Sequence, residues 1–144
     1  STLNKNVKYL TNREAEINID PTMLLTKDEW NKIIGKEPII KKEYILFYDL
    51  KGNSSDIQLA KEISKRLQLP IVITKYMGIK NHFSNFQKKY DCGPLEFLNL
   101  IKNATLVLSS SFHGTVFPII FHTPFFAING EKDLRITNLL TPHK

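Results

Sequence analysis

The stretch ATLVLSSSFHGTV, residues 104–116, decides the fold of this chain. Its apolar, β-rich beginning at residues 104–108 predicts a short buried strand. Residues 115–121 then place Val116, Ile119 and Ile120 at the i, i+3 and i+4 positions of a buried helical face. The serines, histidine and glycine between them therefore form a strand-to-helix turn, which is where a parallel α/β sheet binds its ligands.

Small polar residues give this turn the chemistry of an anion site. The first N–H groups of a helix lack partners within the helix and lie at the positive end of its dipole, so phosphate and carboxylate groups bind there. Three hydroxyl donors follow the strand, Ser109, Ser110 and Ser111. Gly114 lets a ligand approach the backbone, and His113 can transfer protons near neutral pH. The alternative is that the serines only cap the helix and the histidine is structural.

The composition is that of an ordinary globular domain, with 144 residues of which 42% are hydrophobic and 24% charged. The formal net charge is +6, but the 20 lysines and arginines are scattered, without the basic runs or the alternating aromatic and basic residues of a nucleic-acid groove. We therefore expect anionic ligands, or association with an anionic membrane face, and no nucleic acid.

Cysteine content and hydropathy indicate a reducing compartment. The single cysteine, Cys92, cannot form an internal disulfide, and no CxxC motif or Cys/His cluster suggests a metal site. No apolar stretch approaches the roughly 20 residues of a membrane span, and residues 1–5 contain no signal-peptide core. These features predict a cytoplasmic protein.

Strands and helices alternate along most of the chain. The patterns predict strands at residues 44–50, 70–74, 104–108 and 124–128, and helices at 56–68, from Gly93-Pro94 onward, at 115–121 and at 133–140. This order implies an α/β fold of the Rossmann-like kind, with a parallel sheet, helices on both faces and ligands at the carboxyl ends of the strands. Residues 77–91 are expected to be irregular.

The loop after the first predicted strand reaches the same edge of the sheet as the serine turn. It contains Gly52, Asn53 and Ser54, which either contact a ligand or simply form the turn into a capped helix.

The polar residues 1–40 contain two recognisable local signals. Asp20 precedes a proline, a pairing typical of a turn or hinge. Thr26 is followed by two acidic residues, which predicts an N-cap and a short helix with Trp30, Ile33 and Ile34 on one face.

The segments CGPLEFLNLIKNA, residues 92–104, and SSFHGTVF, residues 110–117, resemble the polysaccharide pyruvyl transferase family. Further similarities lie at Asp20-Pro21-Thr22, at Trp30, in the strand at 44–50, and in Pro124-Phe125-Phe126 with Arg135. Together they cover about residues 12–140.

The resemblance implies a two-domain fold like that of GT-B glycosyltransferases, of which this chain is the carboxyl-terminal half. Residues 1–40 would then be an interdomain segment with a short helix, residues 41–144 a Rossmann-like donor-binding domain, and the amino-terminal half of the family would be absent. The implied activity is transfer of pyruvate from phosphoenolpyruvate onto two hydroxyls of a sugar or lipid-linked oligosaccharide, as a ketal, in polysaccharide biosynthesis. No metal or organic cofactor is implied, and the location would be cytoplasmic, including the inner face of the membrane.

The same resemblance assigns roles at the serine turn. His113 would be the acid that protonates the enol carbon of the donor, and the serines with the backbone of Phe112 to Gly114 would bind its anionic groups. Some members of the family carry an arginine two residues before the histidine, where this chain has Ser111. Either this chain represents a branch with a Ser-Phe-His-Gly form, or the cation comes from Arg135, a lysine or the absent half.

Two other functions fit the same edge of the sheet. One is a GT-B glycosyltransferase half that binds a nucleotide sugar. The other is a non-catalytic, glycan-binding relative, suggested by Ser111 and by the absent half. The acceptor sugar and the oligomeric state are left open by the sequence.

Overall fold

The computed structural model describes residues 2–14, 16, 18–50, 52–74, 86–88, 92–128 and 132–141. Their helices are α1 (Thr2–Thr11), the 3-10 helix η1 (Pro21–Leu24), α2 (Lys27–Ile34), α3 (Ser54–Leu67), α4 (Pro94–Asn103), α5 (His113–Phe121) and α6 (Leu134–Leu140). Their strands are β1 (Ile45–Tyr48), β2 (Ile71–Ile73), β3 (Gln87–Lys88), β4 (Leu106–Ser109) and β5 (Phe125–Ala127).

The strands form one parallel sheet in the order β3-β2-β1-β4-β5, which confirms the predicted α/β class. The chain moves outward from β1 to β2 and β3, then returns past β1 to β4 and β5. The order therefore reverses between β1 and β4, and ligands of such sheets bind beyond the carboxyl ends of the strands at that point. The loops that follow β1 and β4 are thus placed together, as the sequence predicted.

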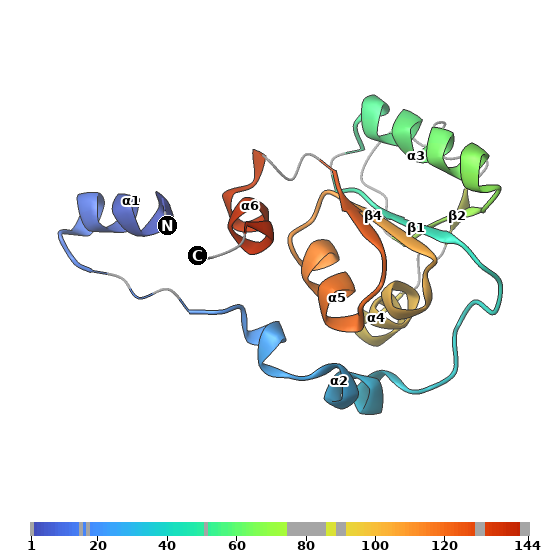
Figure 1. Ribbon diagram of the computed structural model, residues 1–144, viewed down its shortest axis with the longest axis horizontal. Helices are drawn as coiled ribbons and strands as arrows, with labels where there is room; N and C mark the ends of the chain where they lie inside the picture. Colours follow the sequence, from blue (N-terminus) through green and yellow to red (C-terminus); the bar gives the residue numbers. More distant parts are fainter. Residues whose placement is uncertain are drawn as a thin grey trace.

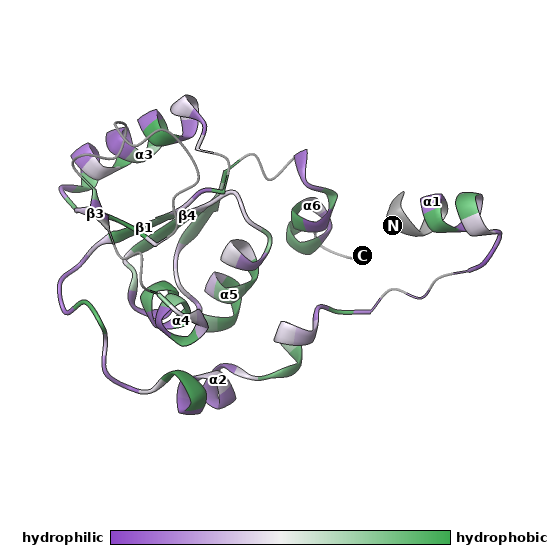
Figure 2. Cartoon of the chain, turned by 180° about the vertical axis from the view of Figure 1, so that it is seen from behind, coloured by the Kyte–Doolittle hydropathy of each residue, from purple (hydrophilic) through white to green (hydrophobic). Residues whose placement is uncertain are grey.

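Helices cover both faces of the sheet, as expected (Figure 1). One apolar cluster joins β1 and β4 to α4 and α5, with Trp30 and Ile34 of α2 packed against it. The other joins the sheet to α3 through Ile57 and Ala60. The two clusters explain why the central strands are buried on both sides and mostly apolar, which Figure 2 shows as largely green ribbon.

The predicted elements are present, with shifted ends. Helix α5 begins at His113 instead of residue 115, and α3 begins at Ser54 instead of residue 56. The N-cap predicted at Thr26 is confirmed, and it is part of a capping box with Glu29 that was not predicted. Ile33 is exposed, so only Trp30 and Ile34 of the expected apolar face point inward.

Three elements were not predicted: η1, α1 and β3. The sequence indicated only a turn or hinge at Asp20, the N-cap of η1. Helix α1 lies apart from the sheet in both views (Figures 1 and 2). Strand β3 falls inside the stretch 77–91 that was expected to be irregular, and it extends the sheet by pairing with β2. Residues 77–85 and 89–91 of that stretch lie outside the described residues.

The segment before β1 is tied to the sheet domain by a buried amide. Asn99 on α4 is 4% exposed. Its Oδ1 accepts from the backbone N–H of Ile39 at 3.0 Å, and its Nδ2 donates to the carbonyl of Glu37 at 2.8 Å. A side chain of α4 thus satisfies the backbone of a connecting segment that has no secondary structure of its own.

We expect Asn99→Ala to lower the free energy of unfolding by about 1–3 kcal/mol, because two backbone groups lose their partner. Chemical denaturation measures this loss. Gln58→Ala is the matched control, since that amide is exposed and donates to Glu62 one helical turn away. Equal stabilities of the two variants would contradict the anchoring role of Asn99.

Candidate functional site

Strands β1 and β4 are joined at their carboxyl ends by a buried carboxylate. Asp49 follows β1 and is 7% exposed. Its Oδ1 accepts a 2.6 Å hydrogen bond from the hydroxyl of Ser110, and its Oδ2 accepts from the backbone N–H of Gly52 at 2.8 Å. The Ser110 oxygen in turn lies 3.4 Å from the backbone nitrogen of Leu50, which donates to it. Because a carboxylate only accepts, the Ser110 proton is committed to Asp49 and the hydroxyl is not a free donor for a ligand.

Ser109 is committed to the structure as well. Its side chain is buried, and its Oγ accepts from the backbone N–H of Ser111 at 3.0 Å. A Cβ atom on Gly114 would lie only 2.1 Å from this Oγ and 3.0 Å from Cδ1 of Tyr48. Close packing of Ser109 beneath the helix thus requires glycine at this position, a reason that differs from the ligand approach expected from the sequence.

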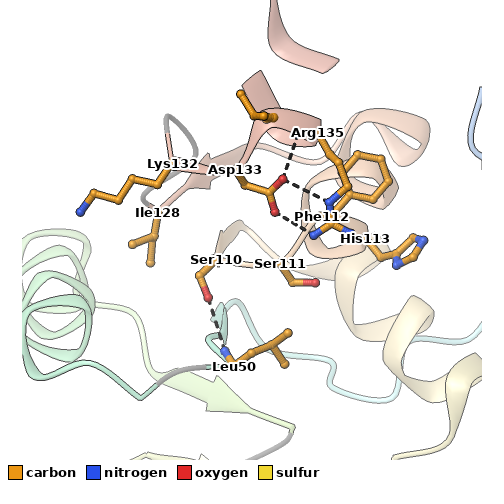
Figure 3. Close-up of a pocket in the computed structure, with 10 residues that line it drawn as sticks. Leu50, Ser110, Ser111, Phe112, His113, Ile128, Lys132, Asp133 and Arg135 are labelled. Atoms are coloured by element: carbon orange, nitrogen blue, oxygen red, sulfur yellow. Dashed lines mark hydrogen bonds and ion pairs between the residues drawn. The ribbon is translucent and has the colours of Figure 1, made fainter. Parts of the chain in front are cut away.

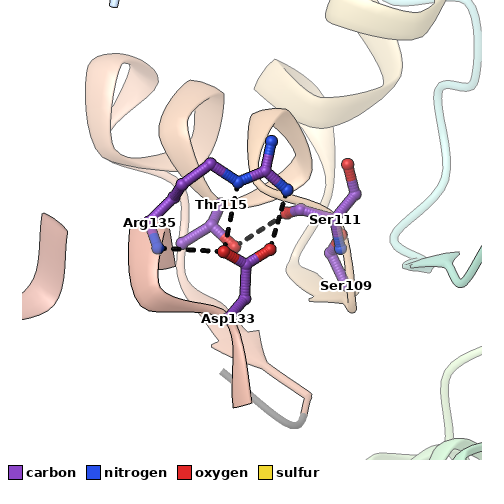
Figure 4. Close-up of polar contacts among 5 residues, drawn as sticks. All are labelled: Ser109, Ser111, Thr115, Asp133 and Arg135. Atoms are coloured by element: carbon purple, nitrogen blue, oxygen red, sulfur yellow. Dashed lines mark hydrogen bonds and ion pairs between the residues drawn. The ribbon is translucent and has the colours of Figure 1, made fainter. Parts of the chain in front are cut away.

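Ser111 differs from the two serines before it. Its carbonyl accepts from the hydroxyl of Thr115 at 3.0 Å, which fixes its backbone on α5 (Figure 4). Within the described part of the chain, the Ser111 hydroxyl makes no hydrogen bond. Of the three predicted hydroxyl donors, Ser111 is therefore the one available to donate a hydrogen bond to a ligand.

The first turn of α5 adds unpaired backbone donors. The carbonyl of Phe112 accepts from the N–H groups of Thr115 and Val116, both at 2.9 Å. The N–H groups of Phe112, His113 and Gly114 have no hydrogen-bond partner among the described residues. They lie at the positive end of the α5 dipole, where an anion is favoured.

A guanidinium group lies over the same turn. Arg135, on α6, has its Cζ 5.1 Å from the centroid of the Phe112 ring, in cation–π geometry. Its Nε and Nη2 donate to Asp133 at 3.1 and 2.8 Å, and Figure 4 shows the two side chains facing each other. These hydrogen bonds raise the pKa of Arg135 and lower the pKa of Asp133, so both groups stay charged at neutral pH. The Nη1 group makes no hydrogen bond within the described residues.

The His113 ring is paired with a residue from the segment before the sheet. Its Nε2 lies 3.4 Å from Oδ2 of Asp20, and its side chain is 52% exposed. Hydrogen bonds from the side chain and backbone of Thr22 lower the pKa of Asp20, with a further contribution from His113, so the carboxylate is ionised at neutral pH. The Asp-Pro pairing favours a turn or hinge at Asp20 over a catalytic role. Nothing in the local sequence pattern places Asp20 beside His113.

These groups surround a pocket of about 640 Å³ (Figure 3). Its lining contains five of the predicted site residues, four from the turn and the start of α5 and one from α6: Ser110, Ser111, Phe112, His113 and Arg135. It adds five residues that were not predicted, Leu50, Ile128, Lys132, Asp133 and Leu134. Ser109 and Gly114 lie beneath the turn and do not line it.

The loop that contains Gly52, Asn53 and Ser54 does not line this pocket. Asn53 donates from Nδ2 to Oδ2 of Asp56 at 3.1 Å, and Ser54 is the first residue of α3. A ligand contact by this loop therefore stays a prediction. The described residues contain no cluster of three or more His, Cys, Asp or Glu side chains able to hold a metal ion.

Comparison with known proteins gives one match. Residues 2–131 match a family model described as polysaccharide pyruvyl transferase. No curated protein and no solved structure matches the chain. In the described part of the chain, none of the helices has both the length and the apolar character needed to cross a bilayer.

We expect Gly114→Ala to destabilise the protein by about 1–3 kcal/mol, because the new methyl group overlaps Ser109 Oγ. Adding Ser109→Gly removes that overlap and should recover part of the loss, with Tyr48 accounting for the remainder. Denaturation of the single and double variants measures the coupling. Additive losses would show that the two side chains do not compete for the same space.

Proposed function

The chain belongs to the polysaccharide pyruvyl transferase family, and we propose that it forms the donor side of an enzyme that transfers pyruvate from phosphoenolpyruvate to two sugar hydroxyls as a ketal. The observation that carries the proposal is the convergence at one turn of a histidine, an arginine, and backbone N–H groups and a serine hydroxyl that have no partner among the described residues. These groups come from the turn after β4, from the start of α5 and from α6.

Phosphoenolpyruvate has two anionic groups on adjacent positions, a phosphate and a carboxylate. The N–H groups at the start of α5 and the Ser111 hydroxyl would bind one of them, as backbone donors at a helix start do for phosphate. Arg135 would bind the other through the part of its guanidinium that Asp133 leaves free. Lys132 also lines the pocket and adds positive charge to it.

We propose that Arg135 takes the place of the arginine that this chain lacks at position 111. Where some family members carry an arginine two residues before the histidine, this chain would supply the guanidinium from α6. Its stacking on Phe112, the residue next to His113, supports this assignment over a purely surface ion pair with Asp133.

In the proposed reaction His113 gives a proton to the methylene carbon of the donor, and the electron pair of the C=C bond forms the new C–H bond. The adjacent carbon then accepts an oxygen from the first sugar hydroxyl. Loss of phosphate breaks the C–O bond to the phosphate group, and the second hydroxyl closes the ketal. Of the two hydroxyl protons released, one restores His113 and the other leaves on phosphate, so the histidine ends the cycle as it began.

The acceptor would be a sugar or a lipid-linked oligosaccharide. The apolar side chains of Leu50, Ile128 and Leu134 line the pocket together with the polar turn. A cytoplasmic location at the inner face of the membrane would give the enzyme access to such an acceptor.

We expect millimolar phosphoenolpyruvate to raise the melting temperature of the intact protein, because a ligand that binds only the folded state stabilises it. Arg135→Ala should reduce or abolish the rise, whereas Arg66→Ala, an exposed arginine on α3, should leave it unchanged. A rise produced by a nucleoside diphosphate and not by phosphoenolpyruvate would instead favour a glycosyltransferase.

Turnover provides the second test. His113→Ala should reduce kcat by about 10²–10⁴-fold, the usual contribution of a positioned general acid. Phosphate release from phosphoenolpyruvate in the presence of acceptor measures the rate. Turnover by this variant at the wild-type rate would remove His113 from the proposed role.

A further inference from the structure

The contact between Asp20 and His113 joins two parts of the chain that are 93 positions apart in sequence. The carboxylate belongs to the residue that caps η1, and the imidazole to the first residue of α5. The proposed function uses the histidine but gives no role to the aspartate.

The two oxygens of Asp20 have separate partners. Oδ1 accepts from the backbone N–H of Thr22 at 3.0 Å and from its hydroxyl at 2.6 Å, which accounts for the cap of η1. Oδ2 faces Nε2 of His113 at 3.4 Å. The cap of η1 thus accounts for the contacts of Oδ1, but it does not account for the contact of Oδ2 with the imidazole of His113.

The elements that carry the pair are held against each other by Trp30. Its Nε1 donates to the carbonyl of Thr22 at 3.1 Å, within η1. The edge of its ring meets Phe117, one helical turn after His113, with centroids 5.3 Å apart and an interplanar angle of 82°. Phe117 also lies beside the His113 ring, at 6.4 Å between centroids. The aspartate is therefore fixed relative to α5 by packing as well as by its own polar contacts.

A carboxylate accepts and does not donate hydrogen bonds, so a carboxylate beside Nε2 favours the proton on that nitrogen. The other ring nitrogen, Nδ1, is then the one left to exchange a proton with a ligand. Hydrogen bonds from Thr22 keep the pKa of Asp20 low, so the carboxylate is present at neutral pH.

We propose that Asp20 is a positioning residue for His113, which holds the proton on Nε2 and turns Nδ1 toward the donor. This inference rests on the proposed role of His113 as the acid. Residues 1–40, which the resemblance assigns to an interdomain segment, would then contribute directly to the active site.

The test uses three variants of the intact protein. Asp20→Asn keeps an oxygen for the η1 cap but removes the charge, and its amide can donate to Nε2 and so move the imidazole proton to Nδ1. Asp20→Ser also keeps a capping oxygen and removes the carboxylate. Thr22→Val is the matched control, because it removes one hydrogen bond of the cap and leaves the carboxylate beside His113. Melting temperatures establish that each variant is folded.

Two properties of Asp20→Asn are measured, the tautomer of His113 and the steady-state kinetics. Long-range ¹H–¹⁵N correlation spectra of the labelled histidines, with His113 assigned from His113→Gln, should show the neutral ring protonated at Nε2 in the wild type and partly at Nδ1 in the variant. Steady-state kinetics should show kcat lowered by roughly 10–100-fold, a part of the contribution of the acid itself, with little change in KM for phosphoenolpyruvate. Asp20→Ser should lose kcat similarly, and Thr22→Val should behave as the wild type in both readouts.

An unchanged tautomer or an unchanged kcat in Asp20→Asn would overturn the proposal. So would an equal loss of kcat in Thr22→Val, which would assign Asp20 to the cap alone. If the wild-type protein does not turn over phosphoenolpyruvate, the proposed function fails, and the spectra still decide whether Asp20 controls the His113 proton.

Discussion

The rest of the structure depends on the parallel pairing of β1 with β4. The two strands are in register from Ile45 and Leu106 to Tyr48 and Ser109. Because the strand order reverses between them, their carboxyl ends mark the place where sheets of this kind form a ligand-binding crevice. The hydrogen bond from Ser110 to Asp49 joins residues 61 positions apart at these strand ends. Ser111, His113 and Arg135 of the proposed donor site line the same pocket as Ser110.

The pairing of β1 with β4 also gives each of the three serines a different set of contacts. Ser109, the last residue of β4, packs against Gly114. The hydroxyl of Ser110 donates a hydrogen bond to the buried carboxylate of Asp49, which follows β1. Both hydroxyls serve to hold the turn in place. The contacts of Ser109 and Ser110 thus position the residues that follow them, so that the Ser111 hydroxyl and the first N–H groups of α5 lie at the pocket. A rigid turn of this kind places its donors before a ligand arrives, which reduces the entropy lost on binding.

Most strands and helices, and the position of the serine turn, could be predicted from the sequence, because each depends on a pattern of neighbouring residues. Apolar runs and helical spacing predict four of the strands and the helices α2 to α6, and the serine, histidine and glycine residues mark the turn. Strand β3 has two residues and no apolar run, so it becomes a strand only through its pairing with β2. The contacts of Asp20 with His113 and of Arg135 with Phe112 depend on tertiary packing, and neither produces a periodic signal.

Side chains from both ends of the chain contact the central turn. An arginine two residues before the histidine would be carried by the turn itself, whereas Arg135 reaches Phe112 from α6. The position of the Arg135 side chain therefore depends on its two hydrogen bonds to Asp133 and on the packing of α6, whose Ile136 is 1% exposed. Asp20 reaches the same turn from η1 through the packing of Trp30 on Phe117. The proposed site is thus assembled from three distant segments, so loss of order in η1 or in α6 would impair it while the sheet stays folded.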